Sequence, residues 1–189
     1  MYDAIICTDC DALVLPAVEN NCSPVQNESE IGYLFISVPD PANPNLPKIV
    51  NPSFATAAVL TSFIAPDGAY LTGIGDLPEP EGDQRVGSLR RIIRDKKRFT
   101  VNFTVDDAND VNYTFLRNME CFPQVFIWYM TLSGKVYGDP ANGITANVSK
   151  ANAPLDRGDG SYERFELALS WEHWNHPPRQ NGWLYEFTP

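Results

Sequence analysis

Hydrophobic and polar residues alternate along much of this chain, which predicts a fold built mainly of β-strands. The alternation is clearest in residues 99–105 and 162–171, where apolar side chains recur at every second position and would share one face of a strand. Residues 31–38 are rich in the aromatic and β-branched side chains that favour strands. Residues 124–132 are almost continuously apolar, which is typical of a central strand covered on both faces. Shorter strands are expected at residues 69–75, 135–137 and 143–151.

One segment has the period of a helix. Its apolar residues recur at every fourth position: Val111, Phe115 and Met119. This spacing predicts an α-helix over about residues 107–119, with Asp106 or Asp107 capping its first turn. Several strands with a single helix late in the chain favour a mainly β fold, a β-sandwich or barrel with one flanking helix, over alternating βαβ layers.

Prolines and glycines mark the connections between the strands. Residues 39–53 hold five prolines, which block a helix or a central strand, so a long loop is expected there. Residues 54–65 are ambiguous between helix and strand, and residues 76–98 form a second long loop. The expected parts are an N-terminal arm of residues 1–30, a β-sandwich domain of residues 31–172 with both loops inserted, and a C-terminal arm of residues 173–189 with a short strand at residues 183–187.

Half of the positive charge lies in one short segment, residues 85–98, which we name the basic strip. It holds seven of the fourteen lysines and arginines: Arg85, Arg90, Arg91, Arg94, Lys96, Lys97 and Arg98. Only Asp95 opposes them, so the strip carries +6, whereas the whole chain carries −10 and the remainder therefore −16. Three explanations are open: the strip binds an external polyanion, docks on the acidic surface of another copy of the chain, or is a solvated loop.

Docking on another copy is the favoured explanation. Nucleic-acid-binding domains usually have an isoelectric point above about 9, whereas the value for this chain is about 4.5 and its acidic remainder would repel phosphates. Ile92 and Ile93 interrupt the charges, as at a protein–protein contact with an apolar anchor and a charged rim. We therefore expect the seven cations of the strip to lie at a subunit interface.

The cysteines give a weak metal signal. Cys7 and Cys10 have the two-residue gap of zinc and redox sites, but Cys22 and Cys121 are too far apart to form the second close pair of a zinc site. Reduced structural thiols are therefore favoured. A disulfide between Cys22 and Cys121 is open only for an oxidising location.

The histidines and the carboxylates at Glu79 and Glu81 give little indication of a metal site or a catalytic site. His173 and His176 lie in a proline-bounded tail without a third ligand nearby, so we expect them to pack on Trp174 or to face solvent. Glu79 and Glu81 flank a proline in a loop, whereas the carboxylates of glycosidases are usually held facing a cleft. We expect no catalytic residue, no cofactor and no bound metal.

Two tryptophans of the tail, Trp174 and Trp183, are further interface candidates. Aromatic rings dominate the energetics of many subunit contacts, but packing on their own domain explains both residues equally well. Together with Trp171, which falls on the apolar side of its strand, they also suggest a sugar-stacking platform. A carbohydrate-binding module is therefore an alternative function.

Hydropathy bears on the cellular setting. No segment approaches the ~20 consecutive apolar residues needed to span a bilayer. The first residues show neither the basic region nor the long apolar region of a signal peptide. We therefore expect synthesis in a cytosol and no membrane partner.

Several architectural features together resemble a known family. They are many short strands, one helix between the strands at residues 99–105 and 124–132, a long charged excursion at residues 77–98, and extended terminal arms. Residues 22–31, followed by the apolar residues 33–36, add to the likeness. In these respects the chain resembles the structural proteins of tailed-bacteriophage virions, most closely tail tube proteins.

The resemblance implies a non-enzymatic subunit of a hexameric ring. In such rings each protomer contributes strands to an inner β-barrel, and rings stack through a long loop and the arms. The implied partners are further copies of the chain and other virion tail proteins, and the implied location is the virion, assembled in the host cytoplasm. An acidic lumen would let double-stranded DNA pass without specific binding, and the acidic excess is consistent with this. The same features fit a head–tail connector or completion ring.

Overall fold

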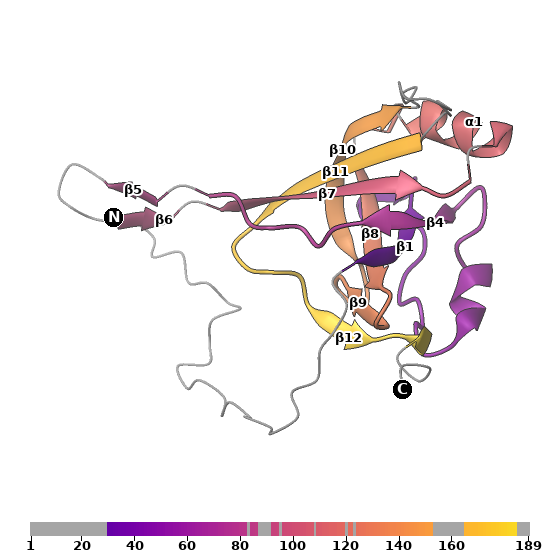
Figure 1. Ribbon diagram of the computed structural model, residues 1–189, viewed down its shortest axis with the longest axis horizontal. Coiled ribbons are helices and arrows are strands. Elements are labelled where there is room, and N and C mark those ends of the chain that lie inside the picture. Colours follow the sequence, from indigo (N-terminus) through magenta and orange to yellow (C-terminus); the bar gives the residue numbers. More distant parts are fainter. Residues whose placement is uncertain are drawn as a thin grey trace, which may run out of the picture.

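The computed structural model describes most of the chain between Glu30 and Leu184 (Figure 1). The described residues are 30–82, 84–86, 92–94, 96–107, 109–119, 121–122, 124–152 and 165–184. Outside them lie residues 1–29 of the predicted N-terminal arm, with Cys7, Cys10 and Cys22, and also Arg90, Arg91 and residues 185–189.

The described residues form short strands, one α-helix and one 3-10 helix. The strands are β1 (Ile31–Ser37), β2 (Pro39–Asp40), β3 (Asn43–Pro47), β4 (Gly68–Gly75), β5 (Gln84–Val86), β6 (Ile92–Arg94), β7 (Lys97–Val105), β8 (Gln124–Thr131), β9 (Lys135–Tyr137), β10 (Ile144–Asn152), β11 (Phe165–His173) and β12 (Arg179–Asn181). The 3-10 helix is Ala57–Thr61, within the segment that the sequence left ambiguous, and α1 is Asp110–Met119. The predicted mainly β class with a single α-helix is confirmed.

Six strands close into an antiparallel barrel. Their order is β1-β4-β7-β11-β10-β8, and pairing of β8 with β1 closes the ring. Of the two architectures that the sequence left open, the structure therefore has the barrel. Because each of these strands has neighbours from the same chain on both sides, a second copy is not needed to cover their edges.

The barrel interior holds the alternating apolar residues that the sequence predicts. β7 contributes Phe99, Val101, Phe103 and Val105, and β11 contributes Phe165, Leu167, Leu169 and Trp171. The two strands pair along their whole length, with Trp171 opposite Phe99 and Phe165 opposite Val105. Burying one such side chain stabilises the fold by about 1.5–3 kcal/mol. The period-two pattern thus identifies the inward face of both strands.

A second apolar core lies outside the barrel, on the face formed by β1 and β8. Its members are Phe35, Phe54, Val59, Phe63, Phe126, Trp128, Met130, Val136 and Trp183. β1 and β8 supply their outward side chains, and the loop after β3 covers them together with the segment after β12. β8 is therefore buried on both faces, as its continuous apolar sequence predicts.

The proline-rich segment is a hairpin, which corrects the prediction of a loop without strands. β2 and β3 pair antiparallel, with Pro39 opposite Pro47. A two-stranded ribbon tolerates these prolines because each strand has a free edge, where the missing N–H group is not required for pairing.

The predicted cap of the helix is also wrong. α1 begins at Asp110, and the capping residue is Asn109, whose Oδ1 accepts a hydrogen bond from the N–H of Asn112 (2.8 Å). Asp107 lies outside the helix and accepts a hydrogen bond from Nδ2 of Asn109 (2.7 Å). The carboxylate of Asp107 therefore orients the capping side chain rather than the helix itself.

The predicted apolar stripe of the helix is confirmed except at its first residue, because Met119 is buried in the barrel core and Phe115 packs against it. Val111 is 76% exposed, whereas Leu116 and Met119 are buried in the barrel core. The reason is that α1 covers one end of the barrel through its later turns, next to β10 and β11 (Figure 1). Neither described helix is long and apolar enough to cross a lipid bilayer.

The C-terminal segment adds to the sheet. β12 pairs with β9, with Arg179 opposite Tyr137 and Asn181 opposite Lys135. The described tail has a strand at Arg179–Asn181. Of the strand predicted at residues 183–187, Trp183 and Leu184 are described and are not in a strand, and residues 185–187 lie outside the described residues. This part of the predicted C-terminal arm packs on its own domain.

Candidate assembly interface

The basic strip forms a hairpin that extends away from the barrel. β5 and β6 pair antiparallel, with Gln84 opposite Arg94 and Arg85 opposite Ile93. In Figure 1 both strands lie well to the left of the barrel, on the continuation of β7. The segment predicted as a long loop at residues 76–98 is thus in part a β-ribbon.

Backbone pairing fixes the direction in which this hairpin leaves the barrel. Glu81 N–H donates to Arg98 O (2.8 Å), and Arg98 N–H donates to Glu81 O (2.7 Å). On its other side β7 pairs with β11 as far as Lys97, which is opposite His173. The hairpin therefore begins from a three-stranded base rather than from an unpaired loop.

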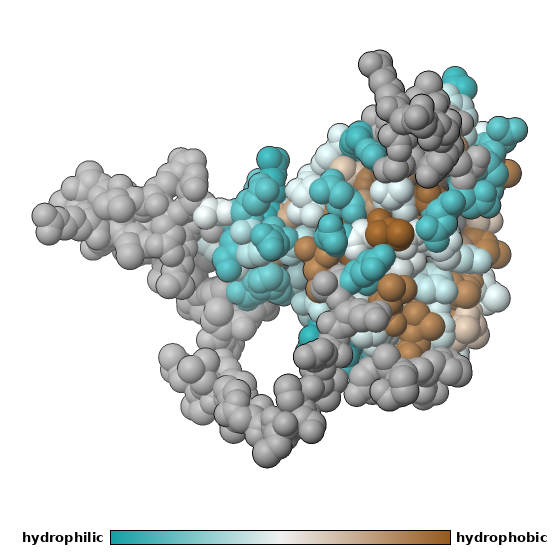
Figure 2. All heavy atoms as spheres, viewed as in Figure 1, coloured by the Kyte–Doolittle hydropathy of each residue, from teal (hydrophilic) through white to brown (hydrophobic). Residues whose placement is uncertain are grey.

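The described cations at this base are exposed and have acidic neighbours. Lys96, Lys97 and Arg98 are all exposed, and Figure 2 shows hydrophilic groups gathered around the base of the hairpin. Arg98 is opposite Glu81 on one side and Glu172 on the other. Among the described residues, neither carboxylate forms an ion pair with Arg98.

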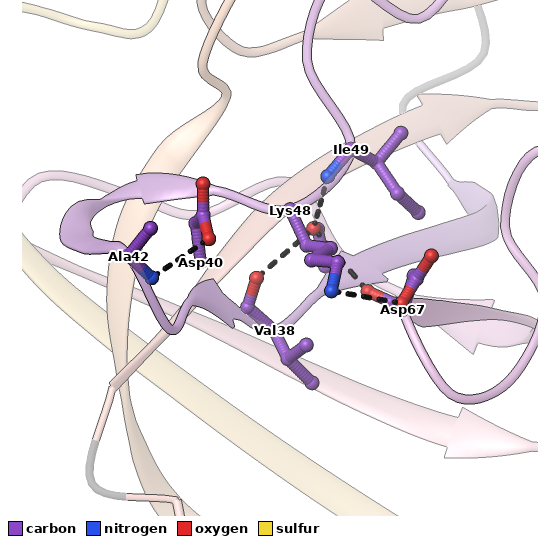
Figure 3. Close-up of polar contacts among 7 residues, drawn as sticks. Val38, Asp40, Ala42, Lys48, Ile49 and Asp67 are labelled. Atoms are coloured by element: carbon purple, nitrogen blue, oxygen red, sulfur yellow. Dashed lines mark hydrogen bonds and ion pairs between the residues drawn. The ribbon is translucent and has the colours of Figure 1, made fainter.

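The proline-rich hairpin is a second exposed element. Asp40 Oδ1 accepts a hydrogen bond from the N–H of Ala42 (2.9 Å), which orders the turn between β2 and β3 (Figure 3). At the base, Lys48 N–H donates to Val38 O (2.9 Å), and Lys48 Nζ lies 3.5 Å from Asp67 Oδ1. Residues 43–46 at the tip are exposed. Proline and side-chain hydrogen bonds thus give an exposed ribbon with little freedom.

The chain leaves the barrel for the two hairpins at opposite ends. β1 ends at Ser37, beside Gly68, and leads into β2. β4 then runs antiparallel to β1, from Gly68 to Gly75, and the chain continues from that far end toward β5. In Figure 1 the purple segment after β1 lies on the right of the barrel, whereas β5 and β6 lie on the left.

The two tail tryptophans have different environments. Trp183 is only 7% exposed, and its ring makes edge contacts with Tyr33 (5.4 Å between centroids) and Phe35 (6.0 Å). Of the two explanations that the sequence left open for Trp183, the structure has packing on its own domain. Trp174 is half-buried. Trp171 lies in the barrel core, stacked on Phe99, so the three indoles do not form one exposed platform.

The paired strands β5 and β6 of the basic strip are called the basic hairpin below. A cleft opens at the barrel end from which this hairpin extends, and we name it the mouth cleft. Its volume is about 680 Å³, and its lining includes Asp76, Leu77, Glu79, Tyr129, Tyr137 and His176. Tyr129 is buried, and its ring stacks on that of Tyr137 with centroids 5.1 Å apart. Burial raises the pKa of Tyr129 well above its ordinary value, and the neighbouring Tyr137 adds to the rise. The hydroxyl therefore stays protonated at physiological pH.

A smaller cleft adjoins the first, because His176 lines both. Its volume is about 470 Å³, and Thr145 and Glu172 lie in its wall. It opens where β10 and β11 stop pairing, beyond Asn147 and Ser170.

Neither histidine is placed for metal binding in the described structure. His173 Nδ1 accepts a hydrogen bond from the N–H of Asn175 (3.1 Å), and the ring of His176 meets Phe99 edge-on (5.3 Å). Among the described residues, no three histidine, cysteine or acidic side chains gather around one point. Cys121 is exposed.

Sequence reasoning did not identify the mouth cleft. Tyr129 lies in a continuous apolar strand and is indistinguishable there from a core residue, and Asp76 follows a strand end among other polar residues. Only the barrel closure brings them together. Comparison of the chain with protein-family models, with curated proteins and with solved structures found no match.

Proposed function

We propose that this protein is a non-enzymatic structural subunit of a tailed-bacteriophage virion, which assembles with copies of itself into stacked hexameric rings of a tail tube. The observation that carries the proposal is the basic hairpin. The basic strip holds half of the positive charge of an acidic chain, and its strands β5 and β6 pair in a hairpin that leaves the barrel, with Lys96, Lys97 and Arg98 at the base. A cationic surface of this kind gains the most electrostatic attraction when it contacts the acidic surface of another copy.

The opposite placement of the two hairpins supports repeated, head-to-tail contacts. When one end of a subunit contacts the other end of the next, the contact is heterologous and generates rings or linear stacks rather than closed dimers. The basic hairpin at one end and the proline-rich hairpin at the other provide two different exposed elements for such contacts.

Net charge supports DNA passage rather than DNA binding. The chain outside the basic strip carries −16. Once the strips are engaged by neighbouring copies, the exposed surface is acidic and repels phosphates. Double-stranded DNA then moves through a ring without adsorbing, and the location of the protein is the virion.

A head–tail connector or completion ring is a second candidate, because it would use the same hairpins in a single ring. The products of assembly separate the two: stacked tubes favour a tube subunit and isolated rings favour a connector. The carbohydrate-binding alternative is weakened by the burial of Trp183, whose ring is not available to stack on a sugar.

The test is charge reversal in the basic strip. A variant with Arg90→Glu, Arg91→Glu and Arg94→Glu should remain folded by circular dichroism but form no rings or tubes by negative-stain electron microscopy. The matched control replaces the same residues with lysine, which keeps the charge, and should still assemble. Tubes of normal length from the glutamate variant, or a wild-type protein that stays monomeric at all concentrations, would refute the proposal.

A further inference from the structure

Aliphatic side chains are exposed at the base of the proline-rich hairpin. Val50 is 52% exposed and Ile64 is 59% exposed. Leu46 is also exposed, and it precedes Pro47, which pairs with Pro39 at the same base. We name Leu46, Val50 and Ile64 the aliphatic patch. Single exposed apolar residues are common on protein surfaces, so the patch is informative only because the fold brings its members together.

Backbone contacts bring two members of the patch to the end of β1. Ile49, the neighbour of Val50, donates its N–H to Ser37 Oγ (3.0 Å) (Figure 3). Gly68 lies opposite Ser37 and donates its N–H to Ile64 O (3.1 Å). Both segments are therefore held at the same strand end, although they are separate in the sequence.

The barrel end that carries the patch is acidic. Lys48 pairs with Asp67, and Arg117 lies in the last turn of α1. More carboxylates than these two cations lie in the same region, and the described ones are Asp40, Asp67, Asp106, Asp107 and Asp110. In Figure 1 α1 and the purple segment after β1 both lie on the right of the barrel. This end thus combines an exposed apolar surface with an excess of negative charge.

The basic strip has the complementary composition. Its sequence places Ile92 and Ile93 among the arginines, and it carries +6. Protein contacts typically combine an apolar centre with a charged rim. The chain leaves the barrel for this strip at the end opposite the patch. Two copies that met through their strips would bring two charges of +6 together, whereas a head-to-tail contact places the strip on an acidic surface.

We infer that the aliphatic patch is the surface on which the basic strip of a second copy of this chain docks. The inference rests on the proposed self-assembly and names the surface that receives the strip. Ile92 and Ile93 of one copy pack on the patch of the next, and the surrounding cations face the aspartates of that end. The contact is heterologous, so each copy uses both of its ends and the assembly can continue.

A peptide tests the patch without requiring assembly. The probe is a labelled peptide of residues 84–98, and its binding to the full chain, at concentrations where sedimentation velocity shows monomers, is followed by fluorescence anisotropy. The variant with Val50→Thr and Ile64→Thr should bind it at least about tenfold more weakly than the wild type, because the contact loses its apolar surface. The far-ultraviolet circular dichroism of the variant should be unchanged, since both side chains are exposed.

The matched control makes the same kind of change at the other end of the barrel. Ile74 and Leu132 are also exposed, and they lie next to Gly75 and Thr131, which pair with Ile31 at the start of β1. The variant with Ile74→Thr and Leu132→Thr should bind the peptide within about twofold of the wild type. A peptide with Ile92→Ser and Ile93→Ser keeps its charge and should bind the wild type at least about fivefold more weakly than the native peptide.

A crosslink tests the same contact in the assembled protein. The full chain carries a photoreactive benzoylphenylalanine in place of Ile93, and illumination should join it to residues 46–64 of another copy, as mapped by mass spectrometry. Equal binding of the peptide by the Val50 and Ile64 variant and the wild type would indicate attraction to the acidic chain as a whole and would overturn the inference. Crosslinks confined to other segments would overturn it too. Ring or tube formation by the wild type is scored separately by microscopy, so an assembled protein with crosslinks elsewhere loses the patch but keeps the proposed function.

Discussion

Gly73 is a position in the barrel wall that has no room for a side chain. A Cβ atom there would lie 2.0 Å from Thr104 O and 2.9 Å from Cε1 of Phe103. Thr104 lies in β7 between β4 and β11 and pairs with Ile74 on one side and Glu166 on the other, so its backbone cannot shift without disturbing both ladders. The glycine allows β4 to approach β7 closely over the inward ring of Phe103.

We therefore expect Gly73→Ala to lower the free energy of unfolding by about 3 kcal/mol, at the upper end of the cost of overpacking. Urea denaturation measures the change. Gly82→Ala is the control, because a Cβ there would come no closer than 3.5 Å to the Lys97 side chain, and it should change the free energy by less than about 0.5 kcal/mol. Similar unfolding midpoints for the two variants would contradict the close approach of β4 and β7.

Trp183 provides a second prediction for a single residue. Its ring fills the outer core against Tyr33 and Phe35, so Trp183→Ala should destabilise the monomer by about 3–5 kcal/mol. Trp174 is half-buried, and Trp174→Ala should cost less than about 1 kcal/mol. Thermal unfolding of the two unassembled variants makes the comparison. If Trp183→Ala left monomer stability unchanged and abolished assembly, the role of this indole would be intersubunit.

The start of α1 is determined by one side chain. Asn109→Ala removes the acceptor for the Asn112 N–H and should cost about 1 kcal/mol, the usual loss for an N-cap. Asp106→Ala removes a carboxylate that does not cap the helix and should cost less than about 0.5 kcal/mol. Chemical denaturation of both variants checks the assignment. A larger loss of unfolding free energy in Asp106→Ala than in Asn109→Ala would show that the aspartate expected from the sequence is the cap.

The base of the proline-rich hairpin depends on a buried hydroxyl. Ser37 is fully buried, and its Oγ accepts a hydrogen bond from the N–H of Ile49 (3.0 Å). Ser37→Ala leaves that N–H without a partner and should cost about 1–3 kcal/mol. The nearby ion pair of Lys48 with Asp67 is solvent-exposed, so Lys48→Met should cost less than about 1 kcal/mol. Denaturant unfolding of the two variants tests this difference, and an equal cost would show that the ion pair matters as much as the hydroxyl.

Strand positions could be predicted from the sequence because the period of two is a local signal. In residues 99–105 the alternation of side chains shows which face points inward. In residues 124–132 the continuous apolar run shows a strand that is buried on both faces. The helix start and the tail strand could not be predicted in the same way. Asn109 competes with two adjacent aspartates for the same capping role, and β12 becomes a strand only because β9 offers it an edge.

At the scale of the whole molecule, the charge asymmetry could be predicted from the sequence, whereas the mouth cleft could not. The basic strip is contiguous in the chain, so it is visible as composition. The mouth cleft draws Asp76, Tyr129 and His176 from segments that are brought together only by barrel closure and by the return of the tail. A feature made of consecutive residues is therefore visible in the sequence, whereas a cleft assembled from distant segments is not.

We expect added salt to weaken assembly while leaving the stability of the folded monomer nearly unchanged. Charge contacts between copies are screened over a Debye length that falls from about 10 Å at 0.1 M to about 3 Å at 1 M salt, whereas apolar burial is not weakened by added salt. In sedimentation velocity, raising NaCl from about 0.05 M to about 1 M should therefore convert assembled wild-type protein to monomers, while the thermal unfolding midpoint of the monomer stays nearly constant. The variant with Arg90, Arg91 and Arg94 replaced by glutamate should be monomeric at both salt concentrations. Assemblies that persist unchanged at high salt would mean that apolar contacts, not the basic strip, hold the copies together.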